Sequence, residues 1–175
     1  MSGHNKWSQI KHKKAKTDGA KSKLYSKYSK LISAEAQKVN GDRNSPSLRA
    51  LIERAKAEDV TNDVIDRAVK KASEPGAALE SITYEAYGPG GCAIIIEAFT
   101  QNKNKAAAEV KHILSANGYS LAAIGSASWA FTREGTEWKP SMTVELSDEN
   151  LVLLEKLVND LEDNEEVQDV FTNVE

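Results

Sequence analysis

Apolar residues after Asp18 recur every three or four positions, which predicts amphipathic helices. Local signals divide this stretch into three helices: Asn40-Gly41 ends the first, Ser45-Pro46 begins the second, and Thr61 caps the third. Helices this short are marginal in isolation. We therefore expect the three to pack together as a helical domain over residues 18–76.

Beyond residue 77 the pattern changes to short β-prone runs separated by turn residues. The expected elements are a strand at 81–87, a turn at 88–91, a strand at 92–100, a helix at 104–117, strands at 126–132 and 141–146, a helix after Ser147, and a strand at 167–174. From Cys92 onward this order is β-α-β-β-α-β. The predicted fold class is therefore α+β, with an N-terminal three-helix domain and, over residues 77–175, a ferredoxin-like βαββαβ domain that has an extra leading strand.

In residues 1–17, Trp7 and Ile10 are the only large apolar residues after Met1, which predicts a flexible basic arm. The arm begins a marked charge gradient. Residues 1–30 hold nine lysines and one acid, a net charge of +8, whereas residues 141–175 hold one base and eleven acids, a net charge of −10. A basic N-terminal segment combined with an acidic C-terminal segment is expected where one end of a protein binds a polyanion.

Composition narrows the classes of protein further. The longest unbroken apolar run, Cys92 to Ile96, is far shorter than the roughly 20 residues of a membrane helix. With the single cysteine Cys92, the chain can form neither an intrachain disulfide nor a thiolate zinc cage. The polar first residues show no signal peptide. These features favour a cytoplasmic location.

No motif for catalysis or for metal binding stands out. His4, His12 and His112 lack metal-binding spacing, and Cys92 at the start of a buried strand is expected to be an inert thiol. The glycine-rich segment 87–91 lacks the lysine and the following helix of a phosphate-binding loop, which favours a plain turn. We therefore expect no enzyme activity, no cofactor, no metal and no small-molecule substrate.

The basic arm and the helix after it carry the candidate nucleic-acid site. Its residues are Lys6, Trp7, Lys11, His12, Lys13, Lys14, Lys16, Lys21, Lys23, Lys27 and Lys30. Lysines bind phosphates and release counterions, and rings can stack on unpaired bases. A solubilising end is the alternative for the lysines, and docking on its own domain is the alternative for Trp7. Lys103 and Lys105 add either a second phosphate contact or an exposed loop.

Several motifs resemble the YebC/PmpR family. The opening SGHNKWSQIKHKKAKTDGAKSKLYSK is similar to the family's G-H-x-K-W-x-x-I-K-H-K-K block, and YEAYGPGGCAIIIEAFTQNKNK is similar to its Y-E-G-Y-G-P-G-G signature. The segments NDVIDRA, GSASWAF and LVNDLEDNEEVQDVFTNVE resemble further family motifs. The chain departs from the family in one respect: only residues 132–140 stand where family members carry an additional inserted domain.

The resemblance implies control of gene expression without catalysis. Family members are described either as DNA-binding transcriptional regulators or as translation factors linked to the ribosome and to difficult nascent peptides such as proline runs. The candidate site contains lysine and no arginine, which suits phosphate contact better than base reading in a duplex. We therefore favour an RNA- or ribosome-bound translation factor, with a DNA-binding regulator as the alternative and a protein-interaction module as a third class. The turn Gly88, Pro89, Gly90 and Gly91 is interpreted as a point of close approach for RNA or nascent chain.

Overall fold

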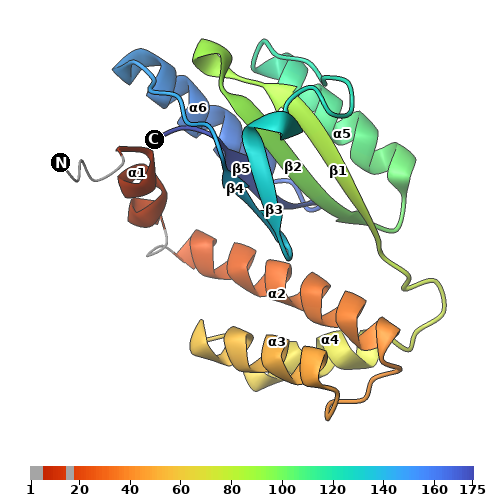
Figure 1. Cartoon of the computed structure of the whole chain (residues 1–175). Helices are drawn as coiled ribbons and strands as arrows, with labels where there is room; N and C mark the ends of the chain where they lie inside the picture. Colours follow the sequence, from red (N-terminus) through yellow and green to blue (C-terminus); the bar gives the residue numbers. More distant parts are fainter. Residues whose placement is uncertain (1–5, 15–17) are drawn as a thin grey trace. The chain divides into compact units, whose positions relative to one another are not determined.

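The computed structural model describes residues 6–14 and 18–175 (Figure 1). The chain divides into two compact units, one comprising Lys16–Glu80 and the other Met1–Ala15 together with Ser81–Glu175. The first unit is helical and the second combines helices with strands, so the predicted α+β class is confirmed. Among the described residues, no helix has the length and apolar character needed to cross a membrane.

The helical unit contains three helices with the predicted caps. They are α2 (Asp18–Lys38), α3 (Pro46–Ala57) and α4 (Asn62–Lys71). The Ser45 side chain accepts a hydrogen bond from the Leu48 N–H, and Thr61 accepts one from the Val64 N–H. The core of the unit is formed by Tyr28, Ile32, Ala36, Leu48, Ala55, Val60, Ile65 and Ala68. The apolar stripe predicted for α2 is thus the surface that packs on α3 and α4.

The second unit is built around a three-stranded sheet. Its elements are α1 (Lys6–Lys14), β1 (Glu80–Tyr87), β2 (Ala93–Thr100), α5 (Lys103–Ala116), β3 (Phe131–Glu134), β4 (Glu137–Pro140), α6 (Asp148–Glu162) and β5 (Val167–Thr172). The strand order is β1-β2-β5, and β3 and β4 form a separate antiparallel hairpin. β2 and β5 run antiparallel, with Ile94 opposite Thr172 and Ile96 opposite Val170.

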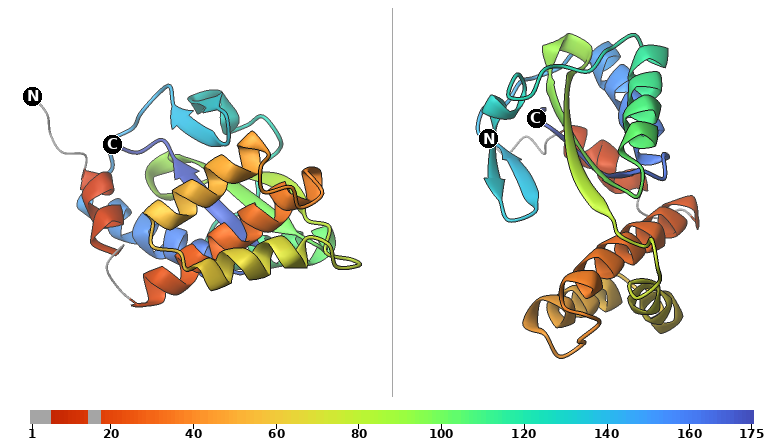
Figure 2. Two further views of the ribbon diagram at one scale, coloured as in Figure 1. Left: turned by 90° about the horizontal axis from the view of Figure 1, so that it is seen from below. Right: turned by 90° about the vertical axis from the view of Figure 1, so that its right-hand side faces the viewer.

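Alternation along β2 divides the core of this unit into two layers. Ile94 and Ile96 belong to the cluster that contains residues of α5 and α6, whereas Ala93 and Ile95 pack with Phe131 of the hairpin. Figure 2 shows α5 and α6 on one face of the sheet and the β3–β4 hairpin on the other. β2 is therefore buried on both faces, which explains its continuous apolar sequence.

The expectation of a flexible arm is wrong for residues 6–14, which form helix α1. Trp7 is only 5% exposed and belongs to the helix-side core of the α/β unit, and Ile10 packs against the same cluster. Trp7 and Ile10 lie three positions apart, so a helix brings both to one face. Burial of these two apolar side chains stabilises α1, although the rest of its sequence is too charged to form a core.

Two predicted strands in the middle of the α/β unit also need correction. In the segment 126–132, a short 3-10 turn at Ser128–Ala130 precedes β3. The segment 141–146 forms only a single bridge, between Val144 and Val174. The N–H groups of Ser141 and Met142 bond to the Ala130 carbonyl instead of to a neighbouring strand. These backbone hydrogen bonds to Ala130 take the place of the strand pairing that the sequence predicted for residues 141–146.

Candidate nucleic-acid interface

The structure describes the predicted basic residues of α1 only in part. Lys6 forms an ion pair with Asp148 beside the start of α6, and both side chains are exposed. Lys11, His12, Lys13 and Lys14 lie in the helix, but their side chains fall outside the described residues, as does all of Lys16. α1 is thus a lysine-rich helix whose first turn is held on the α/β unit.

Trp7 has a structural position. Its indole is buried in the core cluster formed by residues of the sheet, α5 and α6, so it is not available for stacking on a base in this conformation. The sequence left docking and stacking open, and the structure shows docking. The helical spacing of Trp7 and Ile10 is the signal that distinguishes the two.

α2 presents the second set of lysines. Lys21 and Lys23 are exposed, and Lys27 and Lys30 are half-buried. The aromatic residues between them serve the fold: Tyr28 is in the core, and the Tyr25 hydroxyl donates to the Asp59 carbonyl at 3.0 Å. The accessible chemistry of this helix is therefore ammonium groups, which attract phosphate without reading base identity.

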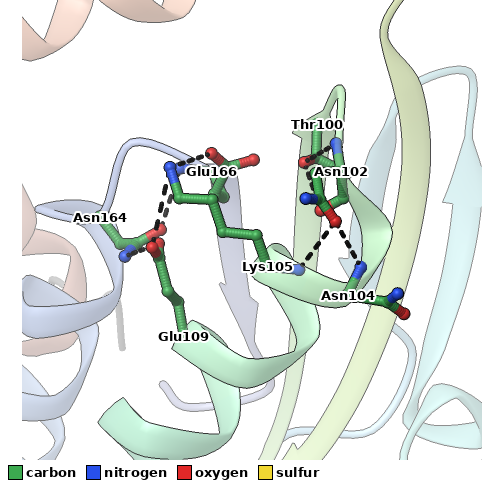
Figure 3. Close-up of polar contacts among 7 residues, drawn as sticks. All are labelled: Thr100, Asn102, Asn104, Lys105, Glu109, Asn164 and Glu166. Carbon is green, nitrogen blue, oxygen red and sulfur yellow. Dashed lines mark hydrogen bonds and ion pairs between the residues drawn. The ribbon is translucent and has the colours of Figure 1, made fainter.

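A hydrogen-bonded turn between β2 and α5 positions the third set of predicted residues (Figure 3). The Asn102 carboxamide oxygen accepts bonds from the N–H groups of Asn104 and Lys105, both at 3.1 Å, and so caps α5. Thr100 closes the turn, because its hydroxyl oxygen accepts the Asn102 N–H and its hydroxyl donates to the Asn102 carbonyl, each at 2.9 Å. The cap occupies N–H groups that would otherwise face an anion.

Lys105 is engaged within the protein. Its ammonium lies 3.2 Å from a Glu166 carboxylate oxygen and 3.8 Å from one of Glu109, as Figure 3 shows. The hydrogen bond and the charge of Glu166, followed by the charge of Glu109, raise the pKa of Lys105. Asn164 donates to Glu109 at 2.7 Å and completes the cluster. Lys103 is exposed, whereas a phosphate would have to compete with two carboxylates for Lys105.

The glycine turn serves internal packing at Gly88 and at Gly90. A Cβ on Gly88 would lie 2.7 Å from Ile94 Cδ1 and 3.2 Å from Cys92 Sγ. Gly88 and Pro89 are buried, whereas Gly90 and Gly91 are exposed and have positive φ values of 65° and 77°. A Cβ on Gly90 would lie 2.6 Å from Leu146 Cδ2, whereas one on Gly91 would meet nothing within 4 Å, so Gly91 is the residue of the turn with open space around it.

The residues considered for chemistry have ordinary structural settings. Cys92 is buried, and burial raises the pKa of its thiol to about 11. His112 is exposed on α5. Within residues 6–14 and 18–175, no three side chains of the metal-ligating types His, Cys, Asp and Glu gather into a candidate metal site.

Sequence reasoning missed two buried carboxylates on the hairpin side of the sheet. Glu85 is 5% exposed and accepts hydrogen bonds from the N–H groups of Gly125, Ala127 and Ser128. Glu97 is 8% exposed and accepts from the Thr83 hydroxyl at 2.8 Å and from Trp138 Nε1 at 2.7 Å. The sequence could have indicated them, because each is a glutamate at an inward-facing position of a strand, and a buried carboxylate requires hydrogen-bond donors.

Comparison with known proteins places these features in a family. The family model described as the TACO1/YebC protein N-terminal domain matches residues 5–75. The model described as the TACO1/YebC second and third domain matches residues 79–137 and 134–174. The two matched stretches overlap at residues 134–137, within the β3–β4 hairpin.

Individual relatives agree with the family models. A probable transcriptional regulatory protein of Thermoanaerobacter pseudethanolicus is 36% identical over 100% of this chain and 97% of its own length. One of Halothermothrix orenii is 42% identical over 93% of this chain, which spans 65% of that relative. The crystal structure of a conserved hypothetical protein of Aquifex aeolicus has a TM-score of 0.83 and 28% identity, covering 97% of this chain and 96% of that one. The chain belongs to the TACO1/YebC family.

Proposed function

We propose that this protein is a non-enzymatic, nucleic-acid-binding regulator of gene expression that acts on RNA at the ribosome. In this role it binds ribosomal RNA in the cytoplasm and aids the synthesis of difficult peptides such as proline-rich ones. The names of its relatives support a regulator. In this proposal, residues 132–140 take the place of the family's inserted domain, and the two units that the structure describes carry the activity.

The observation that carries the proposal is the lysine surface of α2. Lys21 and Lys23 are exposed on α2, and Tyr28, Ile32 and Ala36 of the same helix pack in the core of the helical unit, so the lysines are displayed by a folded support. Residues 6–38 contain no arginine. Specific duplex readers rely on arginine, asparagine or glutamine forks, whereas folded RNA is recognised largely by shape and backbone. The exposed glycines Gly90 and Gly91 remain the proposed point of approach for RNA or nascent chain.

DNA-binding transcriptional regulation is the second candidate, and it is favoured by the names of the relatives, which are called probable transcriptional regulatory proteins. The two functions are separated by sedimentation of the purified protein with purified ribosomes in the presence of excess duplex DNA. The RNA proposal predicts that the protein remains with the ribosomes. Loss to the DNA, together with protection of one promoter segment at roughly a thousandfold preference over bulk DNA, would establish the regulator instead.

A further inference from the structure

Trp129 is an exposed tryptophan with a fixed position. It lies in the 3-10 turn Ser128–Ala130 and is 57% exposed, whereas Trp7 is buried and Trp138 is half-buried against Phe131. Burial of an aromatic side chain is strongly favourable. An exposed indole in an ordered turn therefore calls for an explanation outside the core.

The backbone around Trp129 is held by a buried charge. The Glu85 carboxylate on β1 accepts the Ala127 N–H at 3.1 Å and the Ser128 N–H at 2.6 Å, in addition to the Gly125 N–H. Charge-assisted hydrogen bonds of this kind are about twice as strong as neutral ones. The segment that carries Trp129 is thus anchored to the sheet just before the indole.

The ring is oriented as well. Trp129 Nε1 donates to the Tyr87 hydroxyl oxygen at 3.0 Å, and the Tyr87 hydroxyl donates to the Ser126 carbonyl. These bonds use the polar edge of the indole and leave its faces to other contacts. A side chain already fixed in this way loses little conformational entropy when a ligand stacks on it.

Two exposed apolar residues are connected to the turn, one by a backbone hydrogen bond and one by its position in the sequence. Met142, 58% exposed, follows the hairpin, and its N–H bonds to the carbonyl of Ala130. Ile124, 96% exposed, precedes the turn. A ligand that matches the exposed face of the indole has a flat, uncharged face itself, as an unpaired nucleobase does.

We propose that Trp129 stacks on one unpaired base of the bound nucleic acid, with Glu85 and Tyr87 as positioning residues. The inference rests on the proposed nucleic-acid binding and adds to it a preference for single strands. A duplex gains nothing from this residue, because its bases are already stacked inside the helix.

The test is a fluorescence titration of the full chain with a uridine 12-mer and with a 12-base-pair RNA duplex at several salt concentrations. Trp129→Ala should weaken binding of the single strand roughly 5- to 150-fold, the range for removal of one stacked base. Its salt slope and its duplex affinity should remain those of the wild type, and Trp129→Phe should recover most of the affinity. Leu153→Ala, an exposed apolar change on α6, serves as the matched control.

The outcomes separate this inference from the function on which it rests. Unchanged single-strand affinity in Trp129→Ala would overturn stacking and leave a protein as the occupant of this surface. An equal weakening for strand and duplex would also overturn it, because it would indicate a general phosphate or folding effect. If the wild-type chain bound neither RNA, the proposed function would fail with it. Unfolding midpoints of the variants verify that the fold persists.

Discussion

At the residue scale, Trp7 shows how a side chain that suggests binding can serve the fold. Its indole is 5% exposed within the core of the α/β unit. We expect Trp7→Ala to lower the free energy of unfolding by about 3–5 kcal/mol, the usual cost of removing a buried tryptophan. Urea denaturation checks the value. A variant of normal stability with impaired RNA binding would instead place Trp7 at the interface.

Glu85 gives a pH-dependent prediction. Burial alone raises the pKa of this carboxyl, but hydrogen bonds from the N–H groups of Gly125, Ser128 and Ala127 outweigh it and hold the pKa below its usual value. An unfolded glutamate has a pKa of about 4.3. The stabilisation is therefore complete above about pH 4.3 and is lost as the pH falls through the lower pKa of the folded state.

Glu85→Gln should be less stable than the wild type at neutral pH by about 1–3 kcal/mol, because the substitution removes a charged acceptor of several hydrogen bonds. Below about pH 4.3 the difference between the two unfolding free energies should shrink. Urea titrations at pH 7 and at successively lower pH values measure it. A difference that stays constant with pH would contradict the ionised anchor.

At the element scale, the turn between β1 and β2 is closed by packing as well as by backbone conformation. Because a Cβ on Gly88 would lie 2.7 Å from Ile94 Cδ1, Gly88→Ala should cost about 1–3 kcal/mol of stability. Ile94→Val removes that Cδ1 atom and alone costs about 0.5–1.5 kcal/mol. The double variant should be more stable than the sum of the single changes predicts. Strict additivity in denaturation would show that the steric clash is not the cause.

The lysines of α2 make the corresponding prediction for binding. Lys21→Ala combined with Lys23→Ala should weaken binding to all RNA sequences and reduce the slope of log affinity against log salt by about one unit for each phosphate left without its lysine. Lys70→Ala with Lys71→Ala, also exposed and in the same helical unit, is the control. Equal slopes for the two double variants would argue against α2 as the phosphate-binding helix.

Elements with their own local signals were predictable from the sequence, and elements decided by distant contacts were not. Ser45 and Thr61 cap their helices as expected because capping depends on residues three positions away. The segment 126–132 alternates like a strand, yet its N–H groups bond to Glu85, about 40 positions earlier in the chain. α1 similarly depends on a core made mostly of residues beyond position 85.

At the scale of the whole molecule, the distribution of charge and the names of the relatives both favour a protein that binds nucleic acid. The sequence carries its excess of lysine in the first 30 residues, and the structure distributes these residues over α1 in the α/β unit and α2 in the helical unit. Each unit therefore has its own lysine-rich helix. Composition predicts a candidate site in these helices, but it could not predict the roles of Trp7 and Lys105, because both are determined by partners distant in sequence.

The most direct measurement of the central claim is synthesis of a proline-rich reporter in a purified translation system that is supplied with the messenger RNA. Because no transcription occurs in such a system, only an effect on translation can register. The account predicts that the wild-type protein increases full-length product from the proline-rich reporter relative to a reporter without proline runs, and that Lys21→Ala with Lys23→Ala reduces the increase. Equal synthesis of both reporters with and without the protein would contradict it.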